Sequence, residues 1–320
     1  MTIKQKFTLA VVSVSLLLTA CGSPQPEKKN GQNGNTGSAV TKIDHLHGLT
    51  YSKDGSTLYA ATHEGLISSK DEGSSWLLVG KEANDLMGFN VLPDGTMLTS
   101  GHPGQKSKLP NPLGVMVSKD QGETWEALSL QGKVDFHILA PNTQNPTIIY
   151  ALNQMGEGEY GAGIYKSTDA GKTWEKVASQ GLPTDLTKVV TMLSYSSDPN
   201  LLLAGTEQGV KQSQDGGKTW ADYGDLRIIT ALQVMPNTNN ELISYSLTKQ
   251  KKGVMLSQDE GKSWNFLGLD LGQDAIGYFA VNPKNTNEIS AASFDGNVYI
   301  TKDSGKNWKM IIEKGSVKKQ

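Results

Sequence analysis

The sequence predicts an all-β protein built from six similar units. Three observations lead to this prediction. A short motif that ends in tryptophan recurs six times at nearly regular spacing, and each copy has three short β-rich runs before it and one after it. Long amphipathic helical patterns are absent from the chain. Each unit is about 45 residues long, which suits a sheet of four antiparallel strands.

The repeated motif is Ser/Thr-x-Asp-x-Gly-x-x-Trp, and all six tryptophans of the chain lie in its copies. The aspartate can hydrogen-bond to backbone N–H groups of a turn, the glycine supplies a positive φ, and the tryptophan begins the next strand with a large apolar face. Because every unit has one copy, we interpret the motif as scaffold. Its aspartates are Asp71, Asp120, Asp169, Asp215, Asp259 and Asp303, spaced by 44 to 49 residues.

This pattern resembles the Asp-box, or BNR, repeat, and the resemblance covers residues 43–312. Families with such boxes include sialidases, sortilin-type receptors and photosystem-assembly factors. The resemblance implies a six-bladed β-propeller with four-stranded blades and with the box between the third and fourth strands of each blade. It also invites the label glycosyl hydrolase.

The strand pattern agrees with a propeller over residues 43–313. The first unit reads "HGLTYS", "TLYAATH", "GLISS" and "WLLVG", and the last reads "YFAVN", "EISAAS", "NVYIT" and "WKMII". Turn clusters such as "KDG", "PDG" and "PNTNN" separate the runs. We expect "SAVTKI" (38–43) to add an edge strand that helps to close the ring, and residues 314–320 to form a C-terminal tail.

The N-terminus is predicted to be a targeting segment. Lys4 and Lys6 precede an apolar run, residues 7–20, that ends in "LLLTACGS". The "LTAC" ending resembles a bacterial lipobox, which implies a signal peptide over residues 1–20 and a lipid on Cys21, the only cysteine; the alternative is an ordinary signal peptide with a stray cysteine. Residues 21–42 carry almost nothing to bury, so we expect a disordered tether that holds an extracytoplasmic domain at the membrane of a bacterium.

Charge excludes some function classes. The chain has 30 basic and 32 acidic residues, so nucleic acid is not expected as a partner. Only one basic residue, Arg227, is an arginine. Sialidases hold the substrate carboxylate with three arginines, so we transfer no sialidase catalytic residue to this chain, and whether it is an enzyme stays open.

The five histidines all fall within the first 137 positions. When the units are aligned on their first strands, His47 matches Met87, Asp135, Val190, Thr230 and Gly277. When they are aligned on the end of the second strand, His63 matches His102, Gln154, Glu207 and Phe294. In a propeller these two places share one face, opposite the Asp-boxes. We therefore expect the histidines to gather at the channel mouth of blades 1 to 3, with His137 slightly deeper.

Such a gathering suits a transition metal such as zinc, copper or iron, with His47, His63, His102 and Asp135 as candidate ligands. Two alternatives stay open. One is a metal-free ligand or catalytic site, and the other is a polar channel mouth whose histidines bond to backbone and water. The predicted ligand-binding residues are His45, His47, His63, Met87, His102, Asp135, His137 and Tyr160.

Carboxylates also fall in the loops and strand ends of this face, including Asp44, Glu64 and Asp85. Catalytic candidates are Asp135, Glu207, Glu157 and Glu159. The long insert "NQMGEGEYGAG" (153–163) is expected to stand over the mouth, or else to form a plain long hairpin.

Three functions follow from this sequence. The first is a lipoprotein that binds a metal, a glycan or an envelope protein at the channel mouth. The second is a non-sialidase glycoside hydrolase or lyase that acts at the same face. The third is a purely structural interaction scaffold, similar to the sortilin-type propellers.

Overall fold

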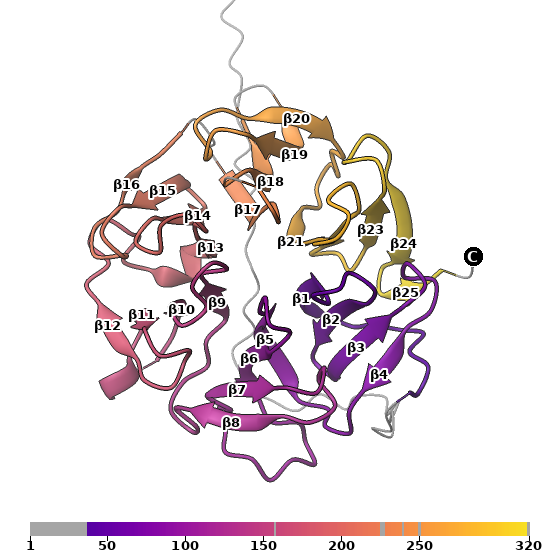
Figure 1. Cartoon of the computed structure of the whole chain (residues 1–320), viewed down its shortest axis with the longest axis horizontal. Coiled ribbons are helices and arrows are strands. Elements are labelled where there is room, and N and C mark those ends of the chain that lie inside the picture. Colours follow the sequence, from indigo (N-terminus) through magenta and orange to yellow (C-terminus); the bar gives the residue numbers. More distant parts are fainter. Residues whose placement is uncertain (1–36, 157, 225–227, 239, 249–250, 319–320) are drawn as a thin grey trace, which may run out of the picture. The chain divides into compact units, whose positions relative to one another are not determined.

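The computed structural model describes residues 37–156, 158–224, 228–238, 240–248 and 251–318. These residues form six antiparallel sheets, which Figure 1 shows around a ring in sequence order. The first strands of neighbouring sheets contact one another, and the first strand of the last sheet contacts that of the first. The predicted six-bladed β-propeller is therefore confirmed.

The strands of each blade follow one another outward from the centre of the ring. Blade 1 comprises β1 (Leu46–Tyr51), β2 (Leu58–Thr62), β3 (Gly65–Ser69) and β4 (Leu77–Val79). Blade 2 comprises β5 (Asp85–Val91), β6 (Met97–His102), β7 (Val115–Ser118) and β8 (Glu126–Ser129). Blade 3 comprises β9 (Ile138–Pro141), β10 (Ile149–Asn153), β11 (Gly163–Ser167) and β12 (Glu175–Val177).

The second half of the ring repeats this order. Blade 4 comprises β13 (Val189–Ser194), β14 (Leu202–Thr206), β15 (Gly209–Ser213) and β16 (Ala221–Asp222). Blade 5 comprises β17 (Ile228–Val234), β18 (Leu242–Leu247), β19 (Lys252–Ser257) and β20 (Asn265–Gly268). Blade 6 has five strands: β21 (Ile276–Val281), β22 (Ile289–Ser293), β23 (Val298–Thr301), β24 (Lys309–Glu313) and β25 (Ser316–Val317). Two short 3-10 turns, η1 (Gly158–Tyr160) and η2 (Leu186–Lys188), complete the described elements.

Apolar side chains fill the spaces between blades. Six clusters of buried residues each join one pair of neighbouring sheets, because alternate side chains of a strand point to opposite faces. Between blades 2 and 3, for example, Leu98 and Val115 pack with Phe136 and Tyr165. The centre of the ring is therefore left to the inner edges of β1, β5, β9, β13, β17 and β21.

Each Asp-box is a hydrogen-bonded turn between the third and fourth strands of its blade. In blade 3, the Ser167 hydroxyl donates to the Asp169 carboxylate and accepts from the Gly171 N–H, both at 2.8 Å. The other end of the turn is held by Thr173, whose N–H and hydroxyl donate to the same carboxylate at 2.9 and 2.6 Å. Trp174 donates its indole N–H to the carbonyl of Gly171.

A short N-terminal segment, residues 37–43, joins the first blade to the last; we name it the clasp. On one side, Val40 N–H donates to the carbonyl of Trp76 and Leu78 N–H donates to that of Ser38. On the other side, Ile43 N–H donates to the carbonyl of Gly315 and Val317 N–H to that of Thr41. The sequence indicated an edge strand over residues 38–43, and the structure places this segment between the blades.

Some predictions concern residues outside those described. They include the signal peptide, the lipid on Cys21, most of the tether, Glu157 and Arg227. The hydrogen bonding of the propeller also extends past the domain boundaries that we predicted. Residues 37–42 and 316–317 pair with the propeller, although we assigned them to the tether and the tail. No helix among the described residues is long and apolar enough to span a membrane.

Candidate functional site

The first strands of four blades are irregular at the same place. Where β1, β13, β17 and β21 begin, one residue is skipped in the pairing with the second strand: His47, Val190, Thr230 and Gly277. Such a bulge turns a side chain away from the regular pleat. These four residues are those that the sequence alignment matched to one another. They mark the channel mouth, the end of the ring where first strands begin and second strands end.

The other two aligned residues, Met87 and Asp135, do not occupy such a bulge. Met87 pairs regularly with Ser100, and the irregularity of blade 2 falls later, between Met87 and Asn90. Asp135 lies before β9 and outside its ladder. The N–H groups of Ser52, Leu92 and Asn142 make the same bond to the residue before the second strand. Counting five residues back from each gives His47, Met87 and His137, so the alignment was two residues out in blade 3 only.

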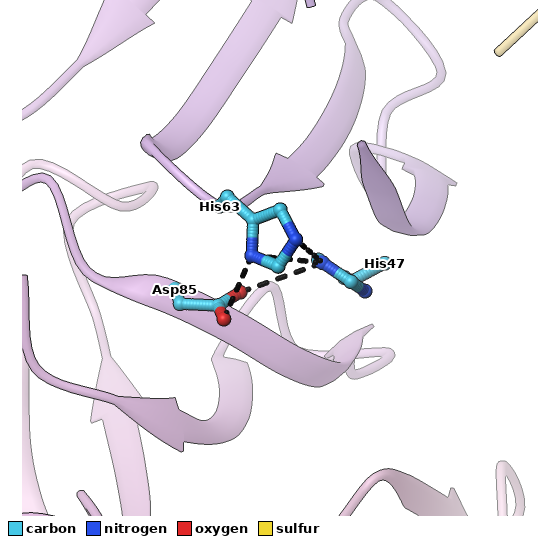
Figure 2. Close-up of side chains that lie close together, drawn as sticks. All are labelled: His47, His63 and Asp85. Carbon is cyan, nitrogen blue, oxygen red and sulfur yellow. Dashed lines mark hydrogen bonds and ion pairs between the residues drawn. The ribbon is translucent and has the colours of Figure 1, made fainter. Parts of the chain in front are cut away.

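Two histidines and one aspartate meet at the mouth between blades 1 and 2, and Figure 2 shows their side chains converging. Nε2 of His47 lies 3.3 Å from each ring nitrogen of His63. Nδ1 of His63 lies 2.8 Å from Oδ2 of Asp85, and Nε2 of His47 lies 3.5 Å from Oδ1 of Asp85. We name this group the first cluster.

Each member of the first cluster has a different local origin. His47 occupies the bulge of β1, His63 opens the turn after β2, and Asp85 is the first residue of β5 on the next blade. His45 adds an exposed ring whose centroid lies 5.1 Å from that of His63. The sequence placed Asp85 on this face but did not include it among the metal ligands, because an isolated aspartate before a strand gives no motif.

The charges of the first cluster are set by burial and by mutual contact. Burial lowers the pKa of His47 to about 4 and outweighs the attraction of Asp85, so this ring is neutral at neutral pH. The hydrogen bond to Asp85 raises the pKa of His63. Burial opposes ionisation of Asp85, but His63 and His47 together outweigh it and lower the pKa of the carboxyl group. Asp85 is therefore an ionised carboxylate between two imidazoles.

Burial, together with the charge of Asp85, also raises the pKa of Tyr278 to about 12. Tyr278 lies on β21, across the seam from blade 1, so the first cluster is close to a phenol of blade 6. Its side chain also packs against the core between blades 1 and 6. Tyrosine in a strand is common, and the sequence offered no signal that this one lies near Asp85.

A second group of the same composition lies between blades 2 and 3. Nε2 of His102 lies 3.0 Å from Oδ2 of Asp135, and Nε2 of His137 lies 3.5 Å from the same oxygen. Nδ1 of His102 lies 2.8 Å from Oδ1 of Asn111, in the long loop of blade 2. The hydrogen bond to Asp135 is the largest cause that raises the pKa of His102 to about 9. We name His102, Asp135 and His137 the second cluster.

The two clusters are neighbours through the sheet of blade 2. Asp85 and His102 are direct partners in the β5–β6 ladder. Side chains of direct partners stand on the same face with their Cβ atoms about 5 Å apart. His45, His47, His63, Asp85, His102, Asp135 and His137 thus form one row across three blades, and the clustering in sequence is clustering in space.

Three buried polar atoms of this row lack a hydrogen-bond partner among the described residues: Oδ1 of Asp85, Oδ1 of Asp135 and Nδ1 of His137. A buried acceptor without a partner costs about 1–3 kcal/mol. Native proteins keep few such atoms, and those that persist commonly face water, an ion or a ligand. Their concentration at one place favours a binding site over a plain polar channel mouth.

Other predicted site residues have different surroundings. Tyr160, on η1, packs against the core between blades 2 and 3, with its ring 6.2 Å from that of Tyr165 and with the Lys133 ammonium 5.2 Å from its centroid. Met87 is half-buried on β5. Glu159 lies on η1, and Glu207 lies in the turn after β14 of blade 4.

The first cluster has the dimensions of a transition-metal site. In a tetrahedral site with bonds of about 2.0–2.1 Å, ligand atoms lie about 3.3 Å apart. Nε2 of His47 lies 3.3 Å from Nδ1 of His63 and 3.5 Å from Oδ1 of Asp85, which is close to this edge length. Imidazole and carboxylate are ligands that zinc and its neighbours accept. Three protein ligands would leave one position open.

The sequence comparisons agree with the repeat architecture. Residues 208–319 match the family described as Sortilin, neurotensin receptor 3, and residues 165–176 match the BNR/Asp-box repeat. No curated protein matches the chain. The fold and the six boxes thus define this chain as an Asp-box β-propeller.

Several solved structures share the fold. The Niastella koreensis GH74 enzyme matches with a TM-score of 0.60 and 16% identity, over 88% of this chain and 47% of that one. The GH74 xyloglucanase from Xanthomonas campestris matches with 0.55 and 16%, over 86% and 46%. The β-propeller domain of Myceliophteria thermophila Cps50 (Swd1) matches with 0.52 and 13%, over 86% and 88%. This chain therefore spans less than half the length of these GH74 enzymes.

Proposed function

We propose that this protein is a lipid-anchored extracytoplasmic propeller that binds a divalent transition-metal ion at its channel mouth. The ligands are His47, His63 and Asp85. The observation that carries this proposal is the convergence of their donor atoms, with two imidazole nitrogens 3.3 Å apart beside a carboxylate oxygen that lacks a hydrogen-bond partner. A metal ion between them would satisfy all three atoms.

The donor set favours some metals over others. Two imidazoles and one carboxylate suit zinc, copper, nickel or iron, whereas calcium and magnesium prefer sites made of oxygen. His47 is neutral at neutral pH, so its Nε2 can bind a metal directly. His63 would bind through Nδ1, the nitrogen that lies 2.8 Å from Asp85, and a proton on that nitrogen must leave first. Zinc binding should therefore weaken as the pH falls below the pKa of His63.

The carboxylates of the two clusters give less support to a glycosidase than to a metal site. Glycoside hydrolysis needs one carboxyl group that stays protonated near neutral pH, which requires a raised pKa. The pKa of Asp85 is lowered instead, and Asp135 lies beside two imidazoles. The likeness to GH74 enzymes concerns the fold, and a fold hosts many activities.

Zinc content tests the proposed site. The protein, purified without a chelator or a histidine tag and dialysed against zinc, should hold zinc that His63→Gln and Asp85→Asn each lose. Glu126→Gln is the matched control, because Glu126 is an exposed carboxylate on the outermost strand of blade 2, and this variant should bind as the parent does. Cobalt should give the visible absorption of a tetrahedral site in the parent and in the control only.

Retention of the same zinc by Asp85→Asn and His63→Gln would refute this site. A parent that binds no zinc, copper, nickel or iron would refute the metal function and leave a glycan or an envelope protein as the ligand. Thermal unfolding of each variant without metal separates a lost site from a lost fold.

The proposal of a lipid anchor rests only on the lipobox-like "LTAC" at residues 18–21. If Cys21 carries the lipid, the protein should fractionate with membranes, and Cys21→Ser should release it into the soluble extracytoplasmic fraction. Equal membrane association of both forms would contradict a lipid on this cysteine.

A further inference from the structure

One more imidazole lies beside the first cluster. The ring centroid of His45 lies 5.1 Å from that of His63 and 6.5 Å from that of His47. The centroids of His47 and His63 are themselves 4.3 Å apart, so the three rings form a triangle at the mouth. His45 is exposed, and neither of its nitrogens is hydrogen-bonded to a residue that the structure describes.

The chain holds the backbone on both sides of His45 and leaves the side chain free. Two residues before it, Ile43 is buried in the clasp, and its N–H donates to the carbonyl of Gly315. One residue after it, Leu46 pairs with Thr62 of β2 and packs against the core between blades 1 and 6. An exposed ring on such a backbone can change its side-chain rotamer without disturbing the fold.

The three rings are spaced much as three ligands of one ion would be. With metal–nitrogen bonds of about 2.0–2.1 Å, imidazoles on a tetrahedral ion have ring centroids about 5 Å apart. The three separations here are 4.3, 5.1 and 6.5 Å. The donor atoms that already converge are those of His47, His63 and Asp85. To reach the same ion, His45 has to turn its ring and approach His47 by about 1 Å.

An imidazole held so near should displace water from the open position of the metal ion. Imidazole is the commonest metal ligand of proteins, and a tethered group competes at a high effective concentration. We propose that His45 is the fourth ligand and closes the site to water and to small anions. This inference rests on the proposed function, because it concerns the ion that the first cluster binds. Four protein ligands are typical of sites that hold a metal, whereas catalytic zinc sites keep a position for water.

Cobalt tests whether a position is open. The cobalt-loaded parent should keep its visible spectrum when thiocyanate is added, because four protein ligands leave no place for the anion. His45→Ala should admit water, so thiocyanate should change its spectrum, and free imidazole should return that spectrum toward the parent's.

Zinc affinity gives a second measurement. His45→Ala should bind zinc about tenfold or more weakly, because even the outer-shell partners of metal ligands contribute about 10- to 100-fold. Gln105→Ala is the matched control, because it removes an exposed, uncharged side chain from the loop after β6 and should behave as the parent does in both measurements.

The outcomes separate this inference from the proposed function. If thiocyanate changes the parent as much as His45→Ala, and both bind zinc equally, His45 is not a ligand and the first cluster alone holds the ion. If the parent binds neither zinc nor cobalt, the proposed function and this inference are both wrong. The response of the parent to thiocyanate needs no variant, so it stays decisive if His45→Ala fails to fold.

Discussion

Single residues at the mouth differ in charge although they share a chemical type. His47 is buried beside other imidazoles, whereas His102 donates to both Asp135 and Asn111. Burial removes the proton from one ring, and two acceptors hold it on the other. One row of histidines therefore contains a neutral ring and a cationic ring at neutral pH.

This contrast predicts two separate titrations in the metal-free protein. The ring of His102 should titrate near pH 9 and that of His47 near pH 4, as followed by NMR of the imidazole nuclei. Asp135→Asn should lower the pKa of His102 toward the ordinary 6.5 and leave His47 unchanged. If both rings titrated near 6.5 in the parent, the hydrogen bonding described for the second cluster would be wrong.

The pKa of His102 also determines how its ionisation changes the stability of the fold with pH. The pKa of His102 is higher in the folded protein than in the unfolded chain, so its contribution to stability is complete below about pH 6.5 and is lost as the pH rises through 9. The contribution is modest because the ring is 43% exposed to solvent. Alkaline pH should weaken the parent more than Asp135→Asn.

At the scale of elements, the Asp-box turn was the element that the sequence predicted best, because its hydrogen bonds are local. The bonds that close the turn in blade 3 join residues at most four positions apart, so the motif alone fixes the turn. One detail was missed. The residue before the glycine also has a positive φ in every box, as in Glu72 at 61° and Ala170 at 62°. Only blade 4 has a glycine, Gly216, at this position.

The clasp is the element with the most distant partners. Gly315 contacts it closely: a Cβ at this position would lie 2.1 Å from the carbonyl oxygen of Ile43. Gly315→Ala should therefore displace the clasp and destabilise the protein by about 2–4 kcal/mol, from backbone strain at φ +75° and from the clash. Urea unfolding measures the loss.

Gly272→Ala is the matched control for the clasp, because Gly272 has φ +64° but no atom within 4 Å of the added Cβ. It should cost only the backbone term, about 1–2 kcal/mol. Hydrogen exchange should become faster at the amides of Leu78 and Val317 in Gly315→Ala alone. Equal effects of the two substitutions would mean that the clasp does not depend on this contact.

At the scale of the whole molecule, the sequence predicted the number of blades, the place of the boxes and the gathering of the histidines. It did not predict how the row divides into two clusters. That division depends on Asp85, which stands opposite His102 across a strand pair, and on Asn111, which reaches His102 from a loop. Such contacts between blades depend on bulges and loop paths that no local pattern encodes.

The clasp also has a consequence for how the ring assembles. Its partners at residues 315–317 lie more than 270 positions further along the chain. Contacts between such distant residues carry the largest loop-closure cost, and proteins rich in them fold slowly. The six sheets can pair locally as the chain emerges, but the seam between the first and the last cannot close before the final residues are made. Until then the face of blade 1 that packs against blade 6 stays uncovered, and so does the side of the clasp that pairs with residues 315–317. During synthesis, this unfinished seam is where a chaperone would have to protect the nascent protein from aggregation.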